Sequence, residues 1–336
     1  MTSLVLCLVL ALGTILIAAE LFTNALEHLG ERLGISEGVT GSLFAAVGTA
    51  LPETLVPLLA LVSGTSQASV NEEIGVGAIL GAPLMLSTLS SFLLLLAVVR
   101  KRGLGGRLAP EMTGFRRDLN FFIGAFAVSA LAMYVPHSSQ GARVALSVIL
   151  VGLYAGYVYL TLRASRSLVQ EGHGTEAPGR LMLSRLKLPA NLATIVLQLA
   201  LALGLLVGGA KGFIYGVQGV AHILGISPLL LSLLVIPVAT ELPEKVNSIL
   251  WVRRGKDTLA LGNITGAMVF QGTLLPALGI LLTPWEPRVE VLTGIALTLT
   301  AAVWLRIHAR SRGVLVWALA GNGLLYATYL CIAFHR

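Results

Sequence analysis

Two glutamates lie in the middle of long apolar runs, where an ionised side chain is costly. Glu53 lies in the run 37–63 and Glu244 in the run 226–251. An ionised acid at the centre of a membrane helix costs about 2.5–3.5 kcal/mol, so such a side chain faces protein, water or a cation. Glu241 adds a third carboxylate three residues before Glu244, on roughly the same face of a helix. The three acids therefore predict a cation-binding site within a membrane.

Each of the two matched glutamates has further oxygen atoms within one helical turn. Thr49 and Thr240 precede their glutamates by four residues, which places hydroxyl and carboxylate on one face. A proline stands directly before each glutamate, and it has no N–H to donate to the carbonyl four residues earlier. Those carbonyls belong to Gly48 and Ala239. Oxygen ligands of these kinds suit a hard cation such as calcium, which takes six to eight of them.

The two glutamates belong to two copies of one pattern, displaced by 191 positions. Leu-Gly-Ile-Ser occurs at 33–36 and again at 224–227, and Leu-Pro-Glu occurs at 51–53 and again at 242–244. A simpler interpretation is that the glutamates are neutral packing residues, because burial favours the protonated acid. The match between the two copies argues against that interpretation, since a paired accident is improbable.

Ten apolar runs are long enough to cross a bilayer, which takes about 20 helical residues. They cover about 3–28, 37–63, 72–99, 119–135, 142–162, 189–216, 226–251, 257–283, 290–305 and 314–333. Five spans is an odd number, so the second copy enters the membrane from the opposite side, as in many secondary transporters. We expect an all-α polytopic membrane protein with a five-helix repeat at 1–163, a cytoplasmic linker at 164–187 and an inverted five-helix repeat at 188–336.

Composition and charge agree with a membrane protein. Hydrophobic residues make up 56% of the chain and charged residues 12%, against roughly 25% charged in soluble proteins. Eighteen of the 23 Lys and Arg residues fall in alternate connections between the predicted spans, counted from the first. The positive-inside rule then places these connections in the cytoplasm and both termini outside a plasma (inner) membrane. The net charge of +7 is thus a topology signal and no indication of nucleic-acid binding.

Residues 48–53 and 239–244 resemble a motif of the calcium/cation antiporter superfamily, the sodium/calcium exchangers and their prokaryotic relatives. Family members carry Gly-Thr-Ser-Leu-Pro-Glu in the second and seventh helices, and this chain has Gly-Thr-Ala-Leu-Pro-Glu and Ala-Thr-Glu-Leu-Pro-Glu. The resemblance implies that helices 2, 3, 7 and 8 surround one cation while helices 1 and 6 slide to alternate access. By position, it implies that the central cation is held by Thr49, Glu53, Thr240 and Glu244.

The chain departs from the family motif at several oxygen ligands. The serine that follows each motif threonine is replaced by Ala50 and Glu241. In the eighth helix Asn263 keeps the family's Gly-Asn pair, but Gln271 stands where the family has Asp or Asn. We include Asn263 and Gln271 among the expected ligands, with Glu241 as a compensating carboxylate. The missing oxygens bring sodium coupling into question and favour protons.

Three further charges lie within apolar runs. Lys245 follows Glu244 directly and is placed to approach Glu241 four residues earlier, which would neutralise that acid. Glu20 matches Lys211 at the same displacement of 191. We interpret this second pair as side chains that reach the membrane interface, in preference to partners of a core charge.

These observations favour an alternating-access antiporter that exchanges a divalent cation, calcium above all, for H⁺ or Na⁺. The alternative is a monovalent cation (Na⁺ or K⁺)/H⁺ antiporter on the same scaffold. A scaffold or channel-like protein with an inactive site also stands. An intramembrane enzyme would need a nucleophile–base pair or a metal centre, and the sequence offers neither. We expect no cofactor beyond the transported cation, inorganic cations and membrane lipid as partners, and a monomer or weak oligomer.

Overall fold

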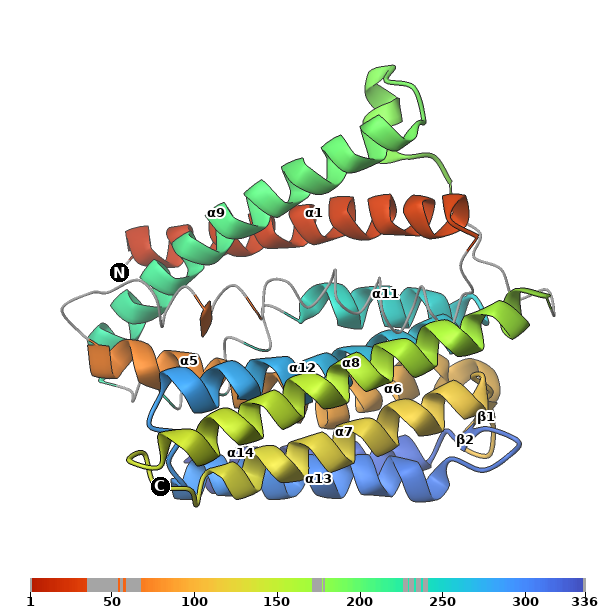
Figure 1. Ribbon diagram of the computed structural model, residues 1–336. Coiled ribbons are helices and arrows are strands. Elements are labelled where there is room, and N and C mark those ends of the chain that lie inside the picture. The colour runs from red at the N-terminus through yellow and green to blue at the C-terminus, as the bar shows by residue number, and fades with distance from the viewer. Residues whose placement is uncertain are drawn as a thin grey trace.

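The computed structural model describes residues 2–34, 54, 57–58, 68–170, 177, 179–225, 229, 233, 237 and 241–334. Within them the chain is a bundle of long helices with one short pair of strands (Figure 1).

Two of the longest helices form a separate pair at one side of the bundle. α1 (Thr2–Arg32) and α9 (Leu192–Leu224) pack against each other along their length (Figure 1). Glycines of α9 permit this approach, because a Cβ on Gly216 would lie 2.5 Å from Cγ of Leu8. Leu10 and Leu201 are among the exposed leucines of the pair, as expected for helices surrounded by lipid.

The third predicted span is one helix with a wide turn in its middle. α5 (Ala68–Met85), the π-helical turn η2 (Leu86–Ser90) and α6 (Ser91–Arg102) follow each other without a break. Pro83 lies inside α5 and cannot donate to the carbonyl four residues before it, and the π turn follows directly. Gly81 lets α5 approach the seventh predicted span, because a Cβ there would lie 2.5 Å from the carbonyl oxygen of Leu233.

α12 (Asp257–Leu282) lies at the centre of the main bundle and is almost entirely buried. α11 (Leu242–Arg253) packs on one side of it and α5 on another. The remaining elements are α7 (Met112–Ala132), α8 (Gln140–Gln170), α13 (Val289–His308), α14 (Ala318–Phe334), the 3₁₀ helix η3 (Met182–Leu186), β1 (Arg107–Leu108) and β2 (Val314–Leu315).

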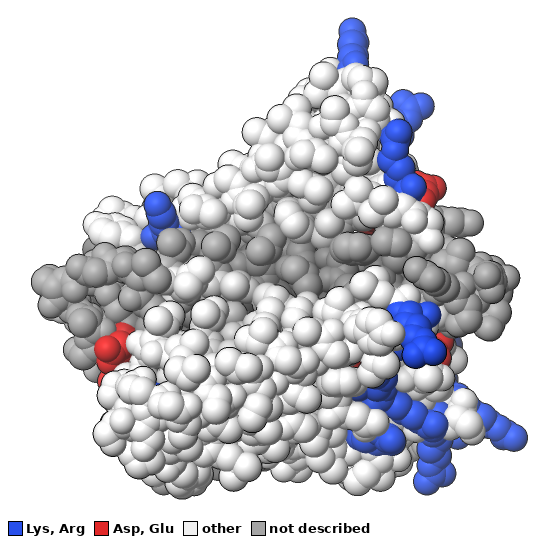
Figure 2. Space-filling view, viewed as in Figure 1, with Lys and Arg blue, Asp and Glu red and all other residues white. Residues whose placement is uncertain are grey.

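Contacts at the two ends of the bundle show which connections lie together. β1 pairs with β2 in antiparallel fashion, so the α6–α7 and α13–α14 connections share one end. Asp257, at the start of α12, joins them through an ion pair with Arg102, 2.7 Å from Nη1 to Oδ2. Lys and Arg gather at this end (Figure 2), and both termini lie at the other (Figure 1).

At the other end Arg143 of α8 is fully buried and donates to three carbonyls at the end of α12. One of them is that of Pro284, 3.0 Å from Nη1. A buried guanidinium thus satisfies carbonyl groups that have no donor within their own helix.

Six of the described helices are long and apolar enough to cross a membrane. They are Ser3–Arg32, Glu72–Arg102, Gln140–Ala164, Leu192–Phe213, Asp257–Leu282 and Val289–His308. The helix α7 carries Arg116, Arg117 and Asp118 near its start, and α11 and α14 are shorter. The chain is therefore a multi-pass membrane protein, while the count of ten spans stays a prediction.

Several helix boundaries differ from those predicted from hydropathy. α7 begins at Met112 and not near 119, because Glu111 accepts hydrogen bonds from the backbone N–H groups of Thr113 and Gly114 and caps the helix. α8 continues past the expected repeat boundary at 163 to Gln170. Residues 314–315 form β2 and not the start of the last helix, since they pair with β1. Hydropathy alone detects neither caps nor strand pairing.

Candidate cation site

The structure describes four of the nine predicted cation ligands: Glu241, Glu244, Asn263 and Gln271. The other five lie outside the described residues: Gly48, Thr49, Glu53, Ala239 and Thr240. The carbonyl groups expected to be free, those of Gly48 and Ala239, are among these five.

Glu244 lies in the first turn of α11 with no exposed surface. Asn263 of α12 is equally buried, and its Nδ2 donates to the backbone oxygen of Glu244 (3.3 Å) and to Oγ of Ser248 (3.1 Å). Two of the predicted ligands, from helices that are adjacent in the bundle, are thus brought together. The Asn263 amide fixes the position of the α11 turn that carries Glu244.

Glu241 and Lys245 form a buried ion pair. Nζ of Lys245 lies 3.0 Å from Oε2 of Glu241, and the two side chains are 3% and 0% exposed. Nζ also donates to the carbonyl oxygen of Pro237 at 3.3 Å. Backbone hydrogen bonds run from Glu241 N to Pro237 O and from Lys245 N to Glu241 O, both at 3.1 Å, so the three residues stack one turn apart on one face. The approach that the four-residue spacing indicated is therefore present.

Gln271 lies on α12 about 12 Å further along the axis than Asn263, at 1.5 Å per residue. Its side chain has no exposed surface. Among the described residues neither its amide oxygen nor its amide nitrogen has a hydrogen-bond partner. A buried amide in that state costs free energy unless something else satisfies it, so its oxygen is available to a bound cation or to water.

A group of buried hydroxyl side chains in and beside the π turn was not predicted from the sequence. They are Ser87, Thr88, Ser90 and Ser91, all at most 2% exposed. The hydroxyl groups of Ser87 and Thr88 donate to the carbonyl of Leu84, whereas Oγ of Ser90 has no partner among the described residues. Four hydroxyl residues in five positions of an otherwise apolar run were the available signal. π turns occur frequently at functional sites, so these buried hydroxyl groups are further candidate oxygen ligands.

A buried acid on α7 was also missed. Asp118 is 1% exposed, and its Oδ2 accepts a hydrogen bond of 2.8 Å from Oγ1 of Thr265 on α12. The guanidinium of Arg117 lies 3.8 Å from Oδ1. This contact ties α7 to α12 at a polar point within the bundle. Its signal was an acid just before the predicted span at 119–135, where it read as part of the connection.

The remaining predicted charges lie at the surface. Glu20 of α1 and Lys211 of α9 are both exposed, and their position at the membrane interface stays a prediction. Within the described part of the chain, no group of three or more His, Cys, Asp and Glu residues is arranged to hold a metal ion.

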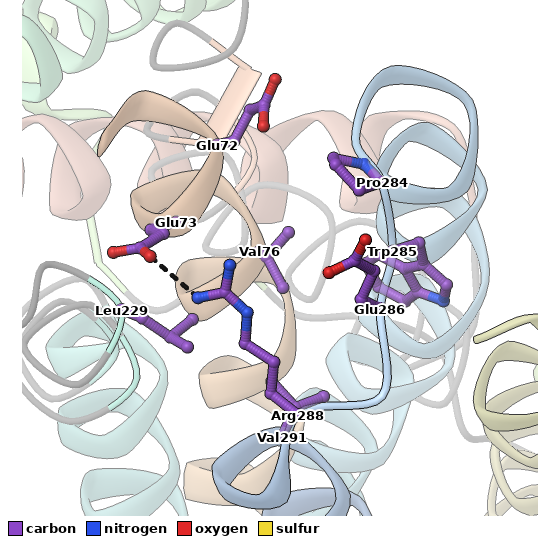
Figure 3. Close-up of a pocket in the computed structure, with 9 residues that line it drawn as sticks. All are labelled: Glu72, Glu73, Val76, Leu229, Pro284, Trp285, Glu286, Arg288 and Val291. Atoms are coloured by element: carbon purple, nitrogen blue, oxygen red, sulfur yellow. Dashed lines mark hydrogen bonds and ion pairs between the residues drawn. The ribbon is translucent and has the colours of Figure 1, made fainter. Parts of the chain in front are cut away.

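A small acidic cavity of about 80 Å³ lies at the end of the bundle away from β1 and β2. Glu72, Glu73 and Glu286 line it, and Arg288 reaches from the start of α13 to Glu73 at 2.8 Å (Figure 3). That hydrogen bond raises the pKa of the Arg288 guanidinium above its usual value, against a smaller opposing effect of burial. One of the three carboxylates is thereby paired with a permanent positive charge.

Comparisons with known proteins agree with the architecture. A family model described as "Sodium/calcium exchanger protein" matches residues 3–163 and 194–335. The chain is 26% identical over 319 residues to inner membrane protein YrbG of Escherichia coli (strain K12), covering 91% of this chain and 90% of that protein. Its fold is similar to that of the H⁺/Ca²⁺ exchanger CAX, with a TM-score of 0.78, 19% identity and 98% and 82% of the two chains covered. It is also similar to the sodium-calcium exchanger NCX_Mj, with a TM-score of 0.66, 18% identity and 98% and 97% covered.

Proposed function

Because this chain belongs to the sodium/calcium exchanger protein family, we propose that it is an alternating-access antiporter that exchanges a divalent cation, calcium above all, for H⁺ or Na⁺. The exchange takes place across the plasma membrane. The basic end of the bundle is cytoplasmic and both termini are outside, as the positive-inside rule requires.

The observation that carries this proposal is the position of Glu244. Its side chain is fully buried within a bundle of apolar helices, at the start of α11 and beside Asn263 of α12. A carboxylate at such a place is costly unless it is paired with a cation or carries a proton. Alternate occupation of one acid by a metal ion and by a counter-ion is the basis of antiport.

The proposed site combines groups from both halves of the chain. Glu244 and Glu53 supply the charge, and Gln271 supplies a neutral oxygen whose lack of a described partner supports this role. Asn263 fixes the Glu244 turn. The expected oxygen ligands in the segments outside the described residues are the hydroxyl groups of Thr49 and Thr240 and the carbonyls of Gly48 and Ala239.

The proposed scaffold has ten membrane helices. Two inverted five-helix repeats, at 1–163 and 188–336, are joined by a cytoplasmic linker at 164–187. The separate family matches at 3–163 and 194–335 support this division. The α1–α9 pair at the side of the bundle is the part that moves, since among the described residues α1 and α9 contact each other far more than they contact the other helices. We expect a monomer or weak oligomer.

One observation favours the alternative, a monovalent cation (Na⁺ or K⁺)/H⁺ antiporter. Lys245 cancels the charge of Glu241, which leaves fewer carboxylates for a divalent ion than the sequence offers. The two functions differ in the labelled ion that is taken up: calcium driven by a sodium or proton gradient in the first, and sodium or potassium driven by a proton gradient in the second.

Radioactive calcium uptake into proteoliposomes tests the proposal. An outward sodium gradient and an outward proton gradient are applied in turn, and a vesicle without either gradient serves as the blank. Uptake above the blank under one gradient supports calcium exchange and names the counter-ion. Absence of uptake under both, together with proton-driven uptake of labelled sodium by the same vesicles, would replace the proposal by the monovalent alternative.

A further inference from the structure

We infer that Lys245 is a built-in counter-ion that occupies Glu241 throughout the transport cycle and so sets how many monovalent cations the site exchanges for its cargo. The inference rests on the proposed antiport function and deepens it. Glu241, which the sequence places among the cation ligands, is then a carboxylate withheld from the transported ion.

The first support is the geometry of the ion pair. Nζ of Lys245 and Oε2 of Glu241 are 3.0 Å apart, and neither side chain has more than 3% exposure. The lysine has a second acceptor in the carbonyl of Pro237, one turn beyond the acid. A buried ammonium with two acceptors on its own helix face cannot leave without stranding an uncompensated charge in the bundle.

The second support is the direction in which the lysine extends. Lys245 follows Glu244 by one position, which separates the two side chains by about 100° around the helix. Its ammonium lies back along the helix at Glu241 and Pro237, four and eight residues earlier in the chain. The lysine therefore neutralises Glu241 and leaves the carboxylate of Glu244 to the transported cation.

The third support comes from comparing the two halves of the sequence. At the displacement of 191, Glu241 corresponds to Ala50 and Lys245 corresponds to Thr54. The half that has the additional acid also has the additional base, and the other half has neither. Acid and base together leave the charge of the site unchanged, which is the pattern expected of a fixed pair and not of an added ligand.

Removal of Lys245 would change the number of cations that the site holds before calcium binds. Without Lys245, the carboxylate of Glu241 would carry a charge in a space closed to water, and a cation from solution would have to compensate it. Binding of calcium would then release this additional monovalent cation together with the cations that the wild-type site releases. Glu244 on the same helix and Tyr326 on α14 are the other titratable groups within electrostatic reach of Glu241 in the described chain.

The test counts the monovalent cations released per calcium ion bound. Binding of radioactive calcium to the purified full-length protein is measured over a range of sodium concentrations at fixed pH, and over a range of pH at fixed sodium. The two slopes of the logarithm of the dissociation constant, added together, give the number of Na⁺ and H⁺ released. For Lys245→Met we expect this number to rise by about one relative to the wild type.

The double variant Glu241→Gln/Lys245→Met makes the test independent of a general loss of folding. It removes both charges, as at positions 50 and 54, and we expect it to regain the wild-type number and to exchange calcium. Lys101→Met, which changes an exposed lysine at the end of α6, is the matched control and should match the wild type. An unchanged number in Lys245→Met, or a double variant that no longer binds calcium, would overturn the inference.

Failure of the inference and failure of the proposed function give different results. If the wild type binds no calcium, the divalent function is wrong. The role of Lys245 is then tested under the monovalent alternative, by comparing the number of protons released per sodium ion bound in the same variants. If the wild type exchanges calcium and the number is the same in all variants, only the role of Lys245 is wrong.

Discussion

Replacing Asp257 by alanine removes a bidentate ion pair at the basic end of the bundle. Its two carboxylate oxygens accept from Nη1 and Nη2 of Arg102 at 2.7 and 2.8 Å. Oδ2 also accepts from the backbone N–H of Ala109 at 2.8 Å. Arg102 in turn donates to the carbonyls of Arg107 and Val252. One carboxylate thus joins the end of α6, the approach to α7 and the start of α12.

The exposure of the two side chains sets the expected magnitude. Removing one partner of a fully buried ion pair costs about 3–5 kcal/mol. Asp257 is 7% exposed, but Arg102 is 23% exposed, so water solvates part of the guanidinium that is left behind. We therefore expect a loss of about 3 kcal/mol, at the lower end of that range. At about 1–2 °C per kcal/mol for a chain of this size, Tm falls by about 3–6 °C.

Thermal unfolding of the detergent-purified protein, followed by tryptophan fluorescence, measures this change. Trp251 is buried next to Val252, whose carbonyl accepts from Arg102, so it reports on this end of the bundle. The control is Arg288→Met, which removes an ion pair with side chains 48% and 27% exposed and should cost less than about 1 kcal/mol. An Asp257→Ala protein with the Tm of the control would refute the reasoning.

Three further substitutions have defined expectations. Arg143→Met leaves three carbonyls at the end of α12 without their buried donor, and we expect unfolding measured as above to show a loss of about 2–4 kcal/mol. Gly81→Ala places a Cβ 2.5 Å from the carbonyl oxygen of Leu233, so α5 must move away from the seventh span. We therefore expect a lower initial rate of calcium uptake. Gly13→Ala is the control, because a Cβ there has no atom within 4 Å, and it should leave the rate unchanged. Gln271→Leu removes a buried amide with no described partner, so we expect no fall in Tm. Calcium affinity, measured by radioligand binding, should drop about tenfold, equivalent to about 1.4 kcal/mol. A lower Tm with unchanged affinity would assign Gln271 to packing.

Local patterns in the sequence predicted several features that the structure confirms. The long helices follow from apolar runs, because a segment in lipid must satisfy its backbone groups internally. The four-residue spacing of Glu241 and Lys245 predicted their approach, since such residues are neighbours on a helix. The clustering of basic residues at one end followed from alternation of charge between successive connections.

Contacts between distant segments could not be predicted in the same way. Asp118 meets Thr265, and Arg143 meets the end of α12, across more than 130 positions of the chain. No local periodicity encodes such a pairing, because it depends on how helices pack. The π turn at Leu86–Ser90 and the pairing of β1 with β2 were missed for related reasons. The first depends on an i→i+5 bond near a proline, and the second on two connections meeting at one end.

The most direct test of the account is gradient-driven calcium exchange by Glu244→Gln. Glutamine keeps the shape of the buried side chain and removes its charge, and Glu31→Gln, at the exposed end of α1, is the matched control. Radioactive calcium uptake into proteoliposomes is compared at equal amounts of folded protein. We expect Glu244→Gln to abolish uptake and Glu31→Gln to retain the wild-type rate. Uptake by Glu244→Gln at the wild-type rate would contradict the central claim that this carboxylate binds the transported cation.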